Sequence, residues 1–221
     1  MFRNILTATL LVCFSTSLFA ENIKKGFEEE TALSEWQFEG DAAISTVQKK
    51  SGEKSLFVPA RSTAICKIST ENKFGTVTMW VYDSCVNNKT TSLGKNWSGP
   101  YFGVFNADGE KFVFTPVWRE TAKPDIYSML WTAEKQWFSL IPSQIKRENA
   151  GWYKFSFHQQ NKNQFKIKVN DVESSKVKTK VDSGSLERFN KGFVGVCLGG
   201  GDDLGEKNET IYFDDIEFDL Q

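Results

Sequence analysis

WYKFSFHQQNKNQFKIKVND, residues 152–171, alternates apolar and polar residues on both sides of a polar centre. Successive side chains of a β-strand point to opposite faces. Phe155 and Phe157 therefore share one face, and Ile167 and Val169 continue that face on the second arm. Lysines, a serine and His158 occupy the other face. The pattern predicts a hairpin that turns at NKNQ, with one face buried and one in water, which is typical of antiparallel sheets.

Further strand patterns, separated by turn signals, continue on both sides of this hairpin. Residues 101–118 predict a second hairpin, with the favoured turn pair Asp108-Gly109 at its centre. Other strands are expected at 64–68, 77–82, 126–141 (as a hairpin), 193–198 and 211–218. The chain contains 19 Phe and 7 Trp, enough to fill a large core. We therefore predict an all-β fold, an antiparallel two-sheet β-sandwich.

Residues 1–20 have the features of a secretory signal peptide. Arg3 provides a basic start, ILTATLLVCF an apolar core too short to span a membrane, and Ala20 precedes polar residues. We expect cleavage near Ala20, a secreted or periplasmic location, no membrane span, and one β-sandwich domain over residues 21–221. The 27 Lys and Arg nearly balance the 28 Asp and Glu, so charge gives no argument for a nucleic-acid partner.

Three cysteines follow the predicted signal peptide: Cys66, Cys85 and Cys197. In an exported protein, Cys66 and Cys85 can form a disulfide that leaves Cys197 alone. Alternatively, all three are buried thiols that pack as small hydrophobic side chains. The sequence leaves both alternatives open.

The last predicted strand contains YFDDIEF, residues 212–218, with two adjacent carboxylates in its middle. Strict alternation places Tyr212, Asp214, Ile216 and Phe218 on one face, which is the row expected to point into the core. A carboxylate buried there needs an ion-pair partner, hydrogen bonds or a metal ion. Asp214 is therefore expected to have a specific partner.

Several segments resemble known sandwich families. GFEEETALSEWQF (26–38), KKSGEKSLFV (49–58) and YFDDIEF resemble the opening strand, the following turn and the closing strand of jelly-roll carbohydrate-binding modules. TVTMWVYDS (76–84) and the hairpin at 151–173 resemble laminin-G and concanavalin A-like domains. The resemblance implies a jelly-roll or concanavalin A-like sandwich. Its motifs are structural, so they specify a fold better than a ligand.

The resemblance to carbohydrate-binding modules also implies one structural calcium ion. Carried over to this chain, its ligands would be Glu28, the backbone oxygen of Lys54, and Asp214 or Asp215. Calcium prefers six to eight hard oxygen ligands, which carboxylates and carbonyls supply. In the alternative interpretation, Glu28 and Asp215 are solvated and Asp214 accepts hydrogen bonds from backbone amides or a lysine.

Exposed aromatic rings are the expected platform for a sugar, because the C–H faces of sugar rings stack on them. The carbohydrate-binding candidates lie in an aromatic, turn-rich part of the chain and are Trp97, Tyr101, Trp118 and Trp131. Trp97 is the first choice because it occurs in the polar loop GKNWSGPY. Three other tryptophans are expected in the core: Trp36, Trp80 and Trp152.

Lysines recur on the polar face of the 152–171 hairpin, at positions 154, 166 and 168, and alternate again in KVKTKV (176–181). Such charges are typical of a solvated sheet face. They also suit an anionic polysaccharide, which we keep as a further hypothesis.

Catalytic constellations are sparse. Asp215-Ile-Glu217 is the nearest match to the "E-x-D-x-x-E" strand of laminarinase-type glycosidases, and it lacks the third acid. His158 is the chain's one histidine and falls on a polar strand face. We predict an exported, non-catalytic polysaccharide-binding domain with a structural calcium. The alternatives are a polysaccharide hydrolase or lyase on the same fold, and a laminin-G-like protein-binding or adhesive domain.

Overall fold

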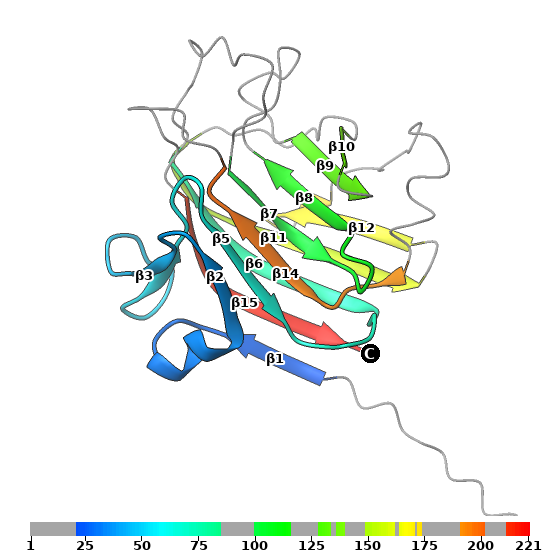
Figure 1. Ribbon diagram of the computed structural model, residues 1–221, viewed down its shortest axis with the longest axis horizontal. Helices are drawn as coiled ribbons and strands as arrows, with labels where there is room; N and C mark the ends of the chain where they lie inside the picture. The colour runs from blue at the N-terminus through cyan, green and yellow to red at the C-terminus, as the bar shows by residue number, and fades with distance from the viewer. Residues whose placement is uncertain are drawn as a thin grey trace, which may run out of the picture.

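The computed structural model of the chain describes residues 21–84, 100–115, 128–133, 136–139, 149–161, 164–170, 172–173, 191–201 and 211–221. Their strands form two antiparallel sheets that are stacked face to face (Figure 1). The predicted all-β, two-sheet antiparallel sandwich is therefore confirmed. Among these residues, no helix is long and apolar enough to cross a membrane. The predicted signal peptide, together with Trp97 and Trp118, lies outside the described residues.

The first sheet, sheet A, has the spatial order β13 (Val172–Glu173), β12 (Gln164–Val169), β11 (Gly151–Asn161), β6 (Gly75–Asp83), β15 (Ile211–Leu220), β4 (Ser55–Phe57), β3 (Ala43–Ser45). An additional strand, β1 (Glu21–Lys25), also pairs with β15. Sheet B has the order β10 (Gln136–Ser139), β9 (Ser128–Ala133), β8 (Lys111–Thr115), β7 (Tyr101–Phe105), β14 (Gly195–Gly199), β5 (Thr63–Lys67), β2 (Trp36–Glu39). A short 3-10 helix, η1 (Glu30–Glu35), precedes β2.

The hairpins form where the alternation predicts them. In the β11–β12 hairpin, Phe155 is registered opposite Val169 and Phe157 opposite Ile167, so the apolar residues of both arms share one face. The β7–β8 hairpin turns through Gly109, whose φ of 78° is in the left-handed region that glycine adopts without strain. The register of the sheets is thus set by apolar rows that one residue of slippage would expose to water.

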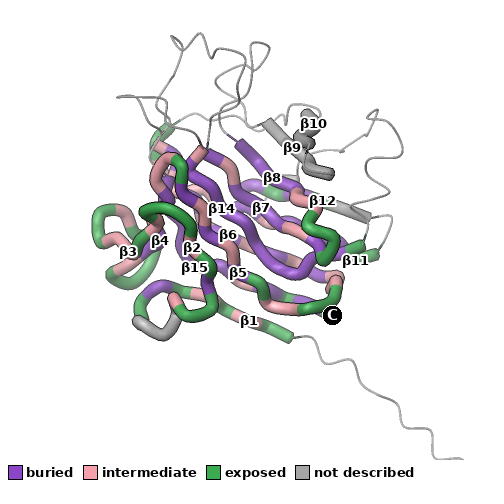
Figure 2. The backbone as a smooth tube through the Cα atoms, viewed as in Figure 1, coloured by how far each residue is buried: buried purple, intermediate pink, exposed green. Residues whose placement is uncertain are grey.

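Phenylalanine rings fill the space between the sheets. Phe102 of β7 meets Phe155 of β11 edge to face, with ring centroids 4.5 Å apart, and Phe213 of β15 at 6.0 Å. Phe112 of β8 reaches Phe157 of β11 at 6.3 Å. All five rings are fully buried. Figure 2 shows the same pattern along the backbone: the central strands are buried, whereas β1 and the excursion around β3 are exposed.

The closing strand β15 changes face at a β-bulge. Its register with β6 shifts between Asp214 and Glu217, and Asp215 has a left-handed φ of 44°. The extra residue interrupts the alternation. Ile216 and Phe218 still point into the core, whereas Asp214 is registered opposite Trp80 on the outer face. The prediction that Asp214 shares the core row is therefore wrong.

The bulge is also where β15 changes its second neighbour. Its first half pairs with β4 through Tyr212 and Phe213, and its second half pairs with β1 over the whole of that short strand. Glu21 is registered opposite Leu220, so the first described residue lies beside the end of the chain (Figure 1).

Two of the three cysteines are described. Cys66 and Cys197 are buried, free thiols. Burial raises the pKa of Cys66 to about 11 and that of Cys197 to about 12. Cys85 lies outside the described residues. For Cys66 and Cys197, the structure therefore matches the alternative of buried thiols.

Candidate functional site: an aromatic row on the outer face of sheet A

Four aromatic side chains form a continuous row across the outer face of sheet A. We call this set the aromatic row: Phe57 of β4, Tyr212 of β15, Tyr82 of β6 and Trp152 of β11. The ring centroids of neighbouring members lie 5.1 Å apart for the first pair, 6.0 Å for the second and 5.6 Å for the third. The last two contacts are edge to face, a favourable arrangement of aromatic rings.

The strand register produces this row. Tyr212 is registered opposite both Phe57 and Tyr82, and Tyr82 opposite Trp152. Directly opposed residues of neighbouring strands share a face, and adjacent strands lie about 4.8 Å apart. Phe57, Tyr82 and Trp152 are half-buried and keep part of their surface in solvent, whereas Tyr212 is 7% exposed.

A second row of side chains lies next to the aromatic row on the same face of sheet A. Trp80, two residues before Tyr82, faces the same way and is half-buried. The ammonium group of Lys50 lies 4.0 Å from the centroid of the Trp80 ring, which is the geometry of a cation–π contact. Trp80 and Trp152 were predicted to be in the core, and that prediction is wrong. Trp36, the third predicted core tryptophan, is 6% exposed, which confirms the prediction for this residue.

The remainder of the outer face is polar. The Thr76 hydroxyl and Nδ1 of His158 lie 2.8 Å apart, and the hydroxyls of Thr78 and Ser156 lie 3.3 Å apart. Lysines flank these pairs: Lys154 on β11, and Lys166 and Lys168 on β12. The outer face of sheet A thus joins an aromatic row to a strip of hydroxyl and amino groups.

One turn organises the acidic residues expected to bind calcium. We call residues 50–54 the junction turn. Glu28 accepts hydrogen bonds from the backbone amides of Glu53, at 3.1 Å, and Lys54, at 3.0 Å. Gly52 has φ +58°, and a Cβ atom there would lie 2.3 Å from the Glu28 carboxylate, so the close approach requires glycine.

The other side of the junction turn contacts β15. Asp214, which is 1% exposed, accepts hydrogen bonds from the amides of Lys50 at 2.9 Å and Ser51 at 3.2 Å. Its other oxygen accepts from the amide of Asp215 at 2.9 Å. The Ser51 hydroxyl donates to Asp215 at 2.9 Å. The structure therefore brings Glu28, Lys54 and both aspartates to one turn, as the resemblance implied.

The groups that face these carboxylates are donors, and a cation needs oxygen acceptors. Glu28 and Asp214 both face backbone N–H groups, and the Lys54 ammonium donates to the Glu28 carbonyl at 2.9 Å. In the described part of the chain, no three His, Cys, Asp or Glu side chains gather as metal ligands. In this arrangement the residues do not fit a calcium ion. The calcium ion that the resemblance implies is left to experiment, and the amide-bonded carboxylates correspond to the alternative interpretation.

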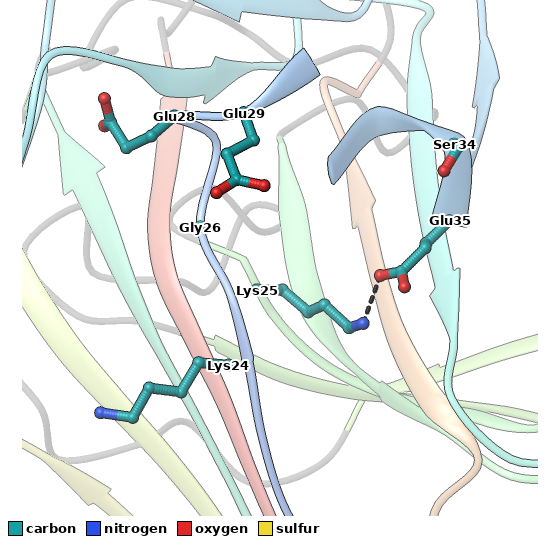
Figure 3. A pocket seen from close by; sticks show the side chains of 7 residues that line it. All are labelled: Lys24, Lys25, Gly26, Glu28, Glu29, Ser34 and Glu35. Atoms are coloured by element: carbon teal, nitrogen blue, oxygen red, sulfur yellow. Dashed lines mark hydrogen bonds and ion pairs between the residues drawn. The ribbon is translucent and has the colours of Figure 1, made fainter. Parts of the chain in front are cut away.

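A cleft of about 500 Å³ adjoins the junction turn, between β1 and η1 (Figure 3). Its lining is charged and contains no aromatic ring: Lys24, Lys25, Gly26, Glu28, Glu29, Ser34 and Glu35. Lys25 and Glu35 form an ion pair across it. Without a ring face for stacking, this cleft is a poorer sugar site than the aromatic row.

Of the four aromatic residues predicted to bind sugar, the two that are described, Tyr101 and Trp131, belong to strands of sheet B rather than to the aromatic row. Tyr101 is half-buried on β7 of sheet B, against Gly199 and below the Lys111 ammonium at 5.6 Å. The backbone of Trp131, on β9, is registered opposite Phe112. Trp97 and Trp118 lie outside the described residues, so their candidacy remains a prediction.

The weak catalytic candidates have other partners. Asp215 is part of the β-bulge and accepts from Ser51, while Glu217 forms an ion pair with Lys24 at 2.9 Å. His158 contacts Thr76 on the polar face. None of these contacts joins the two carboxylates into an acid and nucleophile pair.

The aromatic row crosses four strands, so the pattern of any single strand does not reveal it. TVTMWVY alternates Thr76, Thr78, Trp80 and Tyr82 against Val77, Met79 and Val81. The valines and the methionine form the apolar row, which leaves the two aromatic residues on the threonine face. Reading that alternation would have placed Trp80 and Tyr82 on the outer surface.

No protein-family model matches the sequence. A search of curated proteins also found no match. Solved structures show the same fold. The cellulose-induced protein Cip1 has a TM-score of 0.55 at 16% identity, over 88% of this chain and 95% of that chain. The globular domain of T. cruzi calreticulin has a TM-score of 0.55 at 11% identity, over 90% and 88%.

A third likeness is to the binding domain of Paraclostridial Mosquitocidal Protein 1, with a TM-score of 0.54 at 13% identity. It covers 90% of this chain, and the chain spans about half of that domain, 48%. At these identities the likenesses establish a shared fold. The chain is thus similar in architecture to jelly-roll β-sandwich domains, as its sequence motifs implied.

Proposed function

We propose that the protein is an exported, non-catalytic carbohydrate-binding domain, and that the aromatic row is its platform for a polysaccharide. The observation that carries the proposal is the continuous run of four rings across four neighbouring strands, three of which keep exposed surface. Contiguous apolar surface bordered by polar residues is typical of ligand-binding sites on soluble proteins.

The chemistry of the row suits a sugar chain. The C–H faces of sugar rings stack on aromatic rings, and flanking polar groups bond the hydroxyls. Trp152 and Tyr82 present aromatic surface. Lys154, Ser156 and Thr78 lie on the same face, two or four positions farther along β11 and β6. A row that crosses the strands, rather than a closed pocket, suits an extended polymer better than a small molecule.

The structural neighbours support a binding role without naming the ligand. One is a protein induced by cellulose, and another is the binding domain of a mosquitocidal protein. These names are consistent with sandwiches that recognise external ligands. Export of this chain rests on the signal-peptide features of residues 1–20.

A polysaccharide panel separates binding from catalysis. We expect the mature protein to be retarded in affinity gels that contain its polysaccharide, without release of reducing ends or unsaturated sugars. Release of either product would support the hydrolase or lyase alternative. If the protein binds no polysaccharide and instead captures a protein ligand, the laminin-G-like alternative would replace the proposal.

A further inference from the structure

We propose that the polysaccharide is anionic, with carboxylate or sulfate groups that contact a strip of lysines beside the aromatic row. This inference rests on the proposed function and specifies its ligand. We call Lys154, Lys166 and Lys168 the basic strip; all three are on the outer face of sheet A, on β11 and β12.

The basic strip begins next to the aromatic row. Lys154 follows Trp152 by two positions on β11, so the two side chains share a face about 7 Å apart along the strand. Lys154 is also registered opposite Trp80. A sugar stacked on Trp152 would therefore have an ammonium group within reach of its substituents.

The strip then continues away from the row. Lys168 is registered opposite Ser156, and Lys166 opposite His158, so the positions follow Lys154 along one side of the sheet. Both lysines are exposed. On the other side of Trp80, Lys50 of the junction turn adds a fourth ammonium group. Trp80 thus has the Lys50 ammonium over its ring and Lys154 as its registered neighbour on β11.

Among the described residues, the acidic residues near this strip lie on β15, which β6 separates from β11, and on β13 beside β12. Asp214 is buried and accepts three backbone hydrogen bonds. Glu217 pairs with Lys24 of β1, and Asp219 is on the same distal half of β15. On β13, the backbone of Glu173 is registered opposite Lys168. Lys154, between Trp152 and the polar pairs, is accordingly the most informative lysine to change.

The charge distribution explains how the face would distinguish anionic from neutral sugars. Neutral sugars would gain stacking on the aromatic row alone, whereas uronates or sulfated sugars would add charge-assisted contacts with the basic strip. Contacts of this kind at a solvated surface weaken as salt rises, because the Debye length falls from about 10 Å at 0.1 M to about 3 Å at 1 M. Binding should therefore depend on salt for anionic ligands and little for neutral ones.

The test compares matched polysaccharides in affinity gels and by calorimetry: polygalacturonate against its highly methyl-esterified form, carboxymethylcellulose against hydroxyethylcellulose, and dextran sulfate against dextran, with a glycan array for other backbones. We expect the protein to bind the anionic polysaccharide of at least one pair, and Lys154→Gln to lose about fivefold in affinity for it. Lys67→Gln is the matched control, because Lys67 is an exposed lysine on β5 of sheet B; its affinity should equal that of the wild type.

The outcomes distinguish this inference from the proposed function. If the protein binds only neutral polysaccharides, or if Lys154→Gln and Lys67→Gln bind an anionic one equally well, the inference is overturned while the proposed function stands. If no polysaccharide binds, both fail. Anionic binding that is lost in Lys154→Gln, retained in Lys67→Gln and weakened by salt supports both.

Discussion

The backbone amide of Lys50 donates a hydrogen bond of 2.9 Å to the carboxylate of Asp214, across 164 positions of the sequence. The bond attaches the junction turn to the closing strand at its β-bulge. Glu28 attaches the other end of the same turn to the segment that follows β1. The turn therefore links the segment after β1 to the closing strand β15, and it places Lys50 over Trp80, beside the aromatic row.

Glu28→Ala should destabilise the fold by about 1–2 kcal/mol, because the amides of Glu53 and Lys54 would lose their carboxylate acceptor. Urea unfolding of the variant measures this loss. Glu71→Ala, at an exposed turn position, is the control and should change the free energy of unfolding by less than about 0.5 kcal/mol. Equal stability of the two variants would show that Glu28 does not hold the turn.

Asp214 predicts a specific pH dependence. Burial raises the pKa of its carboxyl above the ordinary value of 3.8, and the hydrogen bonds from Lys50, Ser51 and Asp215 offset this only in part. The folded state then binds the proton more tightly than the unfolded state. The stabilisation is present at low pH and is lost as pH rises through the raised pKa.

Asp214→Asn removes this titration. Relative to Asp214→Asn, the wild type should therefore gain stability as the pH falls from neutral toward 4, measured by urea unfolding at a series of pH values. A wild type that instead loses stability relative to the variant over this range would mean that the folded-state pKa is lowered.

Thermal melting tests whether the carboxylates at the junction turn are stabilised by a calcium ion or by backbone amides. Because the described contacts of Glu28 and Asp214 are with N–H donors, we expect the melting temperature to be the same in millimolar calcium and in chelator. A midpoint that rises with calcium concentration would establish the structural ion that the sequence resemblance implies, since a ligand of the folded state stabilises it.

The buried thiols give a test of the core. With pKa values of about 11 and 12, Cys66 and Cys197 are almost entirely protonated at pH 8. We expect neither to react with a thiol reagent in the native protein, and both to react rapidly after unfolding. Peptide mapping of the labelled protein assigns each site. Fast native labelling of Cys66 would contradict its position between the sheets.

Much of the fold could be predicted from periodicity, because a half-buried strand displays its alternation in the sequence. The 152–171 hairpin is the clearest case, with Phe155 and Val169 in the same buried row. Asp214 shows the limit of that reasoning. A β-bulge at a non-glycine residue leaves no compositional signal, so strict alternation back from Ile216 and Phe218, which do point into the core, predicts the wrong face for Tyr212 and Asp214.

The site was harder to predict because it is a property of the sheet rather than of one strand. Phe57, Tyr82, Trp152 and Tyr212 are far apart in the sequence and meet only through the order β4–β15–β6–β11. Composition favoured burial for Trp80 and Trp152, since large aromatic side chains are usually buried. The acidic residues near both chain ends were grouped correctly because family motifs specify a turn and its neighbours.

The most direct test of the aromatic row is calorimetric titration of Trp152→Ala, Trp152→Phe and Tyr101→Ala with the polysaccharide that the panel identifies. Loss of the Trp152 ring should cost about 2 kcal/mol, or about 30-fold in Kd, whereas Trp152→Phe keeps a stacking surface and should recover much of it. Tyr101→Ala, on sheet B, should bind like the wild type. Wild-type affinity in Trp152→Ala, with affinity lost in Tyr101→Ala, would contradict a site on the outer face of sheet A.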